Sequence, residues 1–323
     1  MIRHALAGVA FAALGLGAAV CAQAQTAVVL NSRDAQVSLL DMREGRETGK
    51  LDVGKEPHHL YPTPDGKSLI VANALGNDLT FLDPRTGAFQ RKVTGIDDPY
   101  QIGFAPDNKR FVVNSLRLDR VDVYDYDGAN FKLVKRFALK SMPSHMAFTP
   151  DSAVAYITLQ GSNQVAALDL RKMEVLWQVP VGEAPAGIFL TPDGKSLLVG
   201  IMGADFVEVI DIASRRTVKR IKTGMGCHNF RALGDKRHVF VGNRVANTIN
   251  MIDMQTLENV ATIPVPGGPD DMEITADGKQ LWTTSRFIKQ VTVVDLASRQ
   301  VIRKIPVGRS PHGIFFVDRA PLL

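Results

Sequence analysis

A proline that precedes a short apolar strand recurs along the chain at an interval of about 42 residues. Cys227 stands where one further proline would fall, so the interval predicts seven copies of one unit. Self-similarity at a period of about 20 to 50 residues is typical of architectures in which each unit buries its apolar face against the next. The prolines are Pro57, Pro99, Pro143, Pro185, Pro269 and Pro311.

Each unit contains four short strands. The apolar strand after the proline leads into a turn such as 63–67 or 191–195, where proline fixes φ and glycine accepts a positive φ. A second strand follows, and then a third and a fourth, as in residues 207–211 and 218–222. Four antiparallel strands in about 42 residues are typical of one blade of a β-propeller.

The two ends of the chain complete each other. Residues 27–31, 36–42 and 47–53 match the second, third and fourth strands of a unit, whereas residues 311–316 match a first strand without successors. Pairing between the two ends would remove the exposed sheet edges. We therefore predict an all-β fold over residues 25–323: a single seven-bladed β-propeller of four-stranded antiparallel blades, closed by the N-terminal strands and the C-terminal strand.

The first residues have the pattern of a targeting segment. Arg3 precedes an apolar run over residues 5–20 that is short for a membrane span, and residues 22–24 offer a small-x-small cleavage site. We predict a cleaved signal peptide over residues 1–24 and a periplasmic or secreted protein without a membrane span. A lipoprotein anchored at Cys21 is the alternative, although the residues before this cysteine form a poor lipobox.

Cysteine content and charge limit the partners. Without the leader, Cys227 is the one cysteine of the chain, so no internal disulfide can form. The formal charge of +5 falls to about +4 when Arg3 is removed, and there is no basic run. This charge gives little support for a strongly polyanionic partner.

Residues 191–199 and 207–211 resemble the YVTN family of β-propeller repeats, and the resemblance covers essentially the whole mature chain. Similar repeats occur in periplasmic propellers that bind single-stranded DNA, in propellers encoded beside quinoprotein dehydrogenases and in surface-layer proteins. The wider superfamily includes the quinoprotein amine dehydrogenase heavy chain, nitrous oxide reductase and haem-binding nitrite reductase propellers. The resemblance therefore implies the fold and leaves the chemistry open.

Polar side chains gather directly after the recurrent proline. The first strand of a propeller blade is innermost, so residues one and two places after the proline should lie at the mouth of the central channel. Five of the seven histidines occupy these places, and the loops between second and third strands add arginines to the same face. The predicted ligand-binding residues are His58, His59, Tyr100, His145, His228, Asp270, Asp271, His312, Arg117, Arg244 and Arg286.

The histidines allow two interpretations. Imidazole binds zinc, copper, nickel and iron, so a transition metal or a metal-bearing anionic cofactor is one candidate occupant. In the other interpretation the side chains form hydrogen bonds with water in a polar channel. The candidate metal ligands are His58, His59, His145, His228 and His312.

The order of the repeats gives two further expectations. His145 and His228 should lie two and four blades beyond the blade of His58, so a site that joins them would favour a broad planar ligand. Asp270 and Asp271 invite an acid and base role, but alternation along a strand would send them to opposite sides. No sequence motif identifies a catalytic nucleophile.

We therefore predict an exported binding or accessory module with a ligand site at the histidine- and arginine-lined mouth, rather than an enzyme by itself. Its partner would be a small ligand or a protein. The first alternative is a propeller oxidoreductase or lyase that carries a metal or an anionic redox cofactor at this mouth. The second is a binder of single-stranded nucleic acid, which would need a basic path with stacking aromatic residues.

Overall fold

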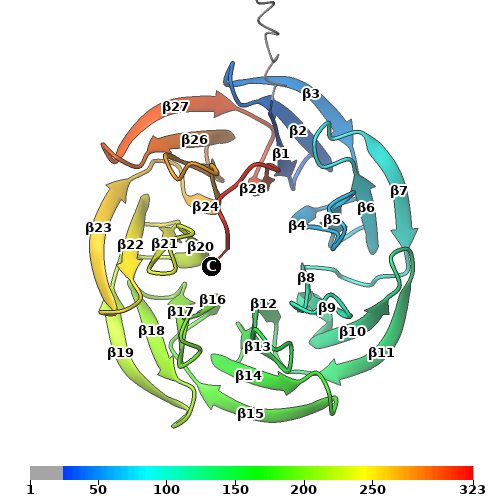
Figure 1. The fold of residues 1–323 in the computed structure, drawn as a ribbon, viewed down its shortest axis with the longest axis vertical. Coiled ribbons are helices and arrows are strands. Elements are labelled where there is room, and N and C mark those ends of the chain that lie inside the picture. The colour runs from blue at the N-terminus through cyan, green and yellow to red at the C-terminus, as the bar shows by residue number, and fades with distance from the viewer. Residues whose placement is uncertain (1–24, 323) are drawn as a thin grey trace, which may run out of the picture.

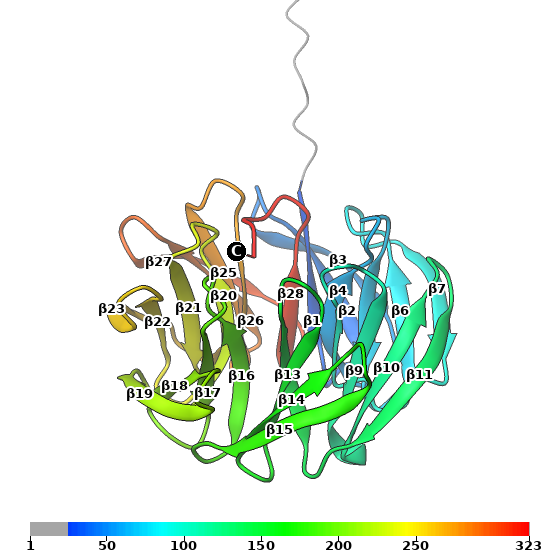
Figure 2. The ribbon, with the colours of Figure 1, turned by 60° about the horizontal axis from the view of Figure 1, so that its bottom comes forward.

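The computed structural model describes residues 25–322 and shows seven four-stranded antiparallel sheets arranged as blades around a central channel (Figure 1). The seven-bladed propeller predicted from the repeat is thus confirmed. Figure 2 shows the ring from the side, with the connecting loops along its two rims. The predicted signal peptide lies outside the described residues.

Six blades are built from consecutive strands, and the innermost strand comes first in each. In chain order, blade 1 is β4 (Pro57–Pro62), β5 (Leu69–Asn73), β6 (Asp78–Leu82) and β7 (Phe89–Thr94), and blade 2 is β8 (Gln101–Phe104), β9 (Arg110–Ser115), β10 (Arg120–Tyr126) and β11 (Phe131–Ala138). Blade 3 is β12 (Pro143–Phe148), β13 (Val154–Leu159), β14 (Gln164–Asp169) and β15 (Glu174–Pro180), and blade 4 is β16 (Pro185–Leu190), β17 (Ser196–Ile201), β18 (Phe206–Asp211) and β19 (Arg216–Lys222). Blade 5 is β20 (Cys227–Ala232), β21 (His238–Asn243), β22 (Thr248–Asp253) and β23 (Glu258–Pro264), and blade 6 is β24 (Pro269–Ile274), β25 (Gln280–Ser285), β26 (Gln290–Asp295) and β27 (Gln300–Pro306).

The closing blade joins the two ends of the chain. Its inner strand β28 (Pro311–Phe315) pairs antiparallel with β1 (Thr26–Asn31), which is followed by β2 (Gln36–Asp41) and β3 (Arg46–Asp52). One 3₁₀ turn, Leu116–Leu118, interrupts the pattern of strands in blade 2. Among residues 25–322, no helix has the length and apolar character needed to cross a membrane.

The core lies between neighbouring blades, because both faces of each middle strand are covered. All five residues of β5 are buried, whereas the outermost strand β19 is mostly exposed. Between blades 1 and 2, Ile70 and Phe81 pack in one apolar cluster with Phe104 and Phe111. This packing holds the inner strands in fixed positions around the channel.

The predicted corner turns are present on the rim opposite the mouth. Gly66 and Gly194 have φ values of 67° and 71°, and a Cβ at either position would meet nothing within 4 Å. Backbone conformation rather than lack of space therefore favours glycine there. Asn108 and Ser152 adopt the same left-handed conformation at the corresponding corners of blades 2 and 3.

The inner strands carry a bulge directly after the recurrent proline. In β24 the pairing breaks after Pro269 and resumes at Met272, so Asp270 and Asp271 share one position of the neighbouring strand. The pairing breaks at the same place in β4, β12, β16 and β20. A bulge re-aims side chains, so two successive residues can both face the channel. The strict alternation expected for the two aspartates does not hold here.

Candidate metal and ligand site at the channel hub

Five histidines from four blades form one contiguous cluster in the channel, and none is more than 6 % exposed. The ring centroids of His58 and His312 are 3.8 Å apart, and those of His59 and His312 are 4.8 Å apart. His145 continues the cluster at 5.2 Å from His59, and His228 lies 4.9 Å from His145. The bulges turn all five side chains toward the axis of the ring. The part of the channel that these five histidines occupy is called the hub below. Ring centroids along the cluster lie 3.8 to 5.2 Å apart, so a site that joins the histidines need not span distant blades.

Each of the five rings has one buried nitrogen without a hydrogen-bond partner among the described residues. These atoms are Nδ1 of His58, His228 and His312, and Nε2 of His59 and His145. Nδ1 of His228 approaches a carboxylate oxygen of blade 6 to 2.9 Å, but without hydrogen-bond geometry. A buried polar atom without a partner costs about 1 to 3 kcal/mol. Five such atoms in one cluster therefore indicate a place for a bound group.

Three histidines have the spacing of metal ligands, and one carboxylate lies beside two of them. The ligand atoms of His58, His59 and His312 all lie within 4.8 Å of one another. Oδ2 of Asp271 lies 3.7 Å from Nδ1 of His59 and 3.6 Å from Nδ1 of His312. Zinc binds histidine nitrogen and carboxylate oxygen at about 2 Å. Small movements of these side chains would therefore bring the three nitrogens to a single ion, with the carboxylate of Asp271 close to two of the histidines.

A second group, His228, Asp270 and His312, has similar spacing but different surroundings. Oδ1 of Asp270 accepts a hydrogen bond from Nε of Arg244 at 2.8 Å, and Oδ2 accepts one from Nη1 of Arg286 at 3.1 Å. Burial would raise the pKa of Asp270, but Arg244 and the neighbouring histidines hold it well below its usual range. This carboxylate is a fixed anion that neutralises two arginines, so it suits a metal ion less well than the first group does.

Asp271 has a different electrostatic environment from its neighbour. Burial raises its pKa to about 6, and the negative charge of Asp270 adds to this effect, while His59 opposes it. Oδ1 of Asp271 accepts a hydrogen bond from Nδ2 of Asn229. The two neighbouring carboxylates thus differ in charge state below about pH 6, where Asp271 takes up a proton and Asp270 stays ionised. Such a difference separates an acid or base from a permanent anion in many active sites.

The histidines of the cluster are neutral near neutral pH. Burial lowers the pKa of His228 and of His312 to about 3, and the positive charge of Arg244 acts in the same direction. Burial also lowers the pKa values of the other three histidines well below the usual value. A neutral imidazole keeps a nitrogen lone pair, which is the form that binds a metal ion.

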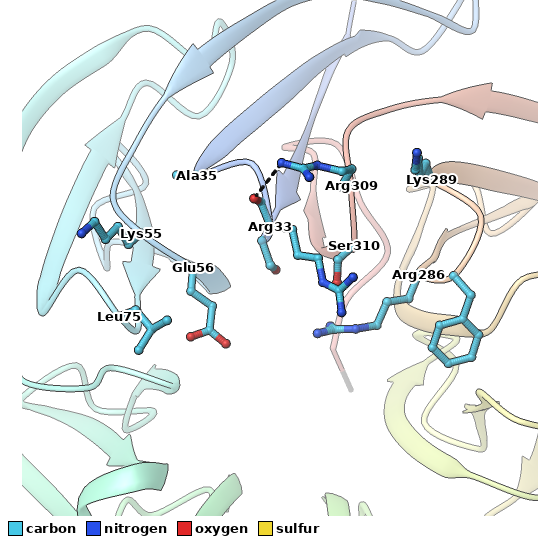
Figure 3. Close-up of a pocket in the computed structure, with 11 residues that line it drawn as sticks. Arg33, Ala35, Lys55, Glu56, Leu75, Arg286, Lys289, Arg309 and Ser310 are labelled. Atoms are coloured by element: carbon cyan, nitrogen blue, oxygen red, sulfur yellow. Dashed lines mark hydrogen bonds between the residues drawn. The ribbon is translucent and has the colours of Figure 1, made fainter.

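On the mouth side of the histidines the channel opens into a cavity of about 750 Å³. Figure 3 shows the side chains of Arg33 and Arg286 extending toward its centre, with Glu56 on the other side. Arg286 also reaches the buried carboxylate of blade 6, so it connects the cavity to the hub. An anion fits this set of charges. The cations that line the cavity are Arg33, Lys55, Arg286, Lys289 and Arg309.

Comparison with known proteins identifies the family. A family model described as YNCE-like beta-propeller matches residues 2–322. The chain belongs to this family. A search of curated proteins finds no match.

Solved structures share the fold at low sequence identity. Hydrazine synthase of Kuenenia stuttgartiensis is 21% identical, with a TM-score of 0.69 over 83% of this chain and 96% of that chain. The dihydro-heme d1 dehydrogenase NirN in complex with DHE is 18% identical, with a TM-score of 0.65 over 90% and 74%. A functionally unknown protein from Desulfotomaculum acetoxidans is 14% identical, with a TM-score of 0.76 over 90% and 98%. These likenesses establish the propeller ring and carry no information on the hub.

Tyr100 and Arg117, which were both predicted at the mouth of this YNCE-like propeller, lie in different places. Tyr100 joins the hub, where its ring centroid lies 3.9 Å from that of His58, and burial raises its pKa. Arg117 lies at the rim, where Nη2 is 2.7 Å from Oε2 of Glu56 and 3.3 Å from Oδ1 of Asp98. It therefore does not join the arginines of blades 5 and 6 at the hub.

The predicted ligand-binding residues did not include several polar residues that position the hub. Oγ of Ser144 lies 2.8 Å from Nδ1 of His145, and Asn229 binds Asp271. Ser144 and Asn229 stand one and two places after the recurrent proline or its cysteine replacement, so their positions were a usable signal. Lys55 lies in the connection before an inner strand, and nothing in the repeat pattern pointed to that position.

Proposed function

We propose that this YNCE-like propeller is a binding module that holds a transition-metal ion at its hub, between His58, His59, His312 and Asp271. The observation that carries the proposal is the cluster of five buried imidazoles, each with an unpartnered ring nitrogen. Three nitrogens and one carboxylate oxygen are a ligand set that zinc and copper accept. Because the histidines are neutral, an ion need not displace protons from them at neutral pH.

We propose in addition that the mouth cavity admits a small anionic ligand to the ion. Arg33, Lys55 and Lys289 line the cavity and form no ion pair among the described residues, so their charge remains available. A cavity of about 750 Å³ suits a compact anion better than a nucleic-acid strand, which needs an extended basic path. Arg117 and Arg244, which a nucleic-acid site would use, already bind carboxylates.

A propeller enzyme with a redox-active metal or an anionic redox cofactor at the hub is the second candidate. The neighbouring carboxylates favour it, because Asp270 is a fixed anion while burial raises the pKa of Asp271 to about 6 in the metal-free hub. A group with a pKa near working pH can accept and return a proton. Two proteins similar in fold are a synthase and a dehydrogenase. An optical spectrum with bands beyond the aromatic region would favour this candidate.

We propose that the protein works in the periplasm or outside the cell, after removal of residues 1–24. Cys227 supports this, because burial raises its pKa to about 11 and keeps the thiol unreactive in an oxidising compartment. Mass spectrometry of the exported protein should give an N-terminus at Gln25. An intact leader in the purified product would contradict the proposal.

Metal analysis tests the hub. Protein purified from its native compartment without chelators should contain about one equivalent of zinc or copper per chain, measured by inductively coupled plasma mass spectrometry. His58→Gln should weaken metal binding more than about a hundredfold, since even partners of the ligands contribute 10- to 100-fold.

The matched control is His238→Gln, because His238 lies outside the hub and pairs with Asp235. This control should retain the metal. Equal metal content in the two variants, or no binding by the unmodified protein after reconstitution, would exclude the proposed centre.

A further inference from the structure

A second cavity lies on the other side of the histidine cluster from the mouth, and its volume is about 300 Å³. Its lining residues follow the histidines along the inner strands of blades 1 to 5. His59 and His145 close its inner end. None of the described residues that line it carries a formal charge, and the walls are mainly apolar: Met146, Phe148, Phe189 and Phe230.

This inner cavity selects a different kind of ligand from the mouth. An anion that entered it would lose its hydration without meeting a cation, which is strongly unfavourable. A neutral molecule would remove apolar surface from water and contact aromatic walls. An engineered apolar cavity of about 150 Å³ binds benzene. A cavity of about 300 Å³ therefore has room for two fused rings.

The inner end supplies a polar anchor. His145 is 1% exposed, its Nδ1 lies 2.8 Å from Oγ of Ser144, and its Nε2 has no partner among the described residues. The contact at Nδ1 orients the ring and leaves Nε2 without a partner, in a residue that lines the cavity. A neutral imidazole nitrogen either donates or accepts, depending on the tautomer. A hydroxyl group satisfies Nε2 in both cases, because it can do either.

The C-terminal tail forms part of the wall of this cavity. Leu322 lines it, and Figure 1 shows the C-terminus in the middle of the ring. The buried side chain of Arg231 donates to the carbonyl oxygens of Ala320 at 2.6 Å and Pro321 at 2.9 Å, and Glu273 holds its guanidinium in place. The wall formed by the tail is thus built into the fold.

We propose that the inner cavity binds a small neutral aromatic alcohol, with its rings against the aromatic walls and its hydroxyl group on Nε2 of His145. The proposal goes beyond the metal centre, because His145 is not one of the proposed metal ligands. A molecule bound there would reach the hub from the side opposite to the anionic ligand.

Two fluorescent probes that differ by one hydroxyl group, 2-naphthol and naphthalene, test the proposal on the full mature protein. We expect 2-naphthol to bind at least about tenfold more tightly than naphthalene, with or without zinc. His145→Phe should lower the affinity for 2-naphthol to that for naphthalene, because it keeps the ring shape and removes the nitrogen. Leu322→Ala should weaken both probes severalfold, and Leu75→Ala, at the mouth, should weaken neither.

Equal affinities for the two probes, or no binding of either, would overturn the proposal. An unchanged affinity in Leu322→Ala would also overturn it, and because Leu322 is 45% exposed we expect this variant to fold. If His145→Phe does not fold, the selectivity of the unmodified protein and the effect of Leu322→Ala decide. Metal content measured in the same samples separates this result from the test of the hub.

Discussion

Blade 1 and blade 4 have the same four strands but contribute differently to the hub. After its recurrent proline, blade 1 places His58 and His59 in the channel, whereas blade 4 places Ala186 and Gly187 there. The backbone of blade 5 comes so close to blade 4 that a Cβ on Gly187 would lie 2.0 Å from the carbonyl oxygen of His228. The repeat therefore determines the ring, and the two residues after the recurrent proline determine whether a blade places polar side chains or small residues in the hub.

The largest difference in stability between hub and ring variants should come from substitutions of buried carboxylates. Asp270→Asn leaves Arg244 and Arg286 without their shared anion, so we expect a loss of about 3 to 5 kcal/mol in unfolding free energy. Blade 4 offers a matched control in Glu208→Gln, because Glu208 is also buried but its partner Arg220 is largely exposed.

Glu208→Gln should cost about 1 kcal/mol, because the amide oxygen can still accept from Arg220 and only the hydrogen bond from the backbone N–H of Gly182 is lost. Urea denaturation at neutral pH measures both variants. Similar losses in the two would show that the hub carboxylate has no special role, and would remove the distinction between blade 6 and blade 4.

Adding one methyl group to blade 4 should have the next largest effect. In Gly187→Ala the new Cβ meets backbone atoms, which cannot rotate away, so we expect a loss of about 1 to 3 kcal/mol or more. The control is Gly49→Ala in β3, where the nearest atom would be 4.0 Å away. Thermal unfolding should show a lower midpoint for the first variant and no decrease for the second. An unchanged midpoint in Gly187→Ala would mean that the two blades are not in close backbone contact.

Much of the ring was predictable because its determinants are local and repeated. The proline interval and the turns gave the blades, and the incomplete units at the two ends gave the closure. The histidines were found by their place after the proline, but their mutual contacts depend on bulges that alternation does not reveal. The inner cavity was not predictable either, since residues from five blades and the C-terminal tail meet there only in three dimensions.

The arginines show the same limit on a finer scale. Arg244 and Arg286 are the first residues after their strands and reach the hub, whereas Arg117 is the second residue after its strand and binds carboxylates at the rim. A displacement of one place along a loop decides which charge a long side chain meets. Assigning Arg117, Arg244 and Arg286 to equivalent loops made them look alike in the sequence. Their exact positions after the strand distinguish them in the structure.

The dependence of stability on pH gives the most graded test of the comparison, because blade 4 places no ionisable group in the hub. His228 and His312 have an ordinary pKa of about 6.5 when unfolded and about 3 when folded. Between these values the unfolded chain binds more protons than the folded one, so the stability of the metal-free protein rises with pH from about 3 to 6.5. Asp271 acts in the opposite direction, because its folded pKa of about 6 lies above its unfolded value.

The two histidines outnumber the aspartate, so the unfolding free energy of chelator-treated protein should increase between pH 4 and pH 7. Each histidine contributes at most about 1.4 kcal/mol per pH unit. His228→Gln should therefore make the profile shallower, and Asp271→Asn should make it steeper between pH 4 and 6. Urea titrations at several pH values measure these slopes. A flat profile in the unmodified protein would mean that the hub histidines are as accessible to protons as they are in the unfolded chain, and the contrast between blade 1 and blade 4 would then be one of shape and not of charge.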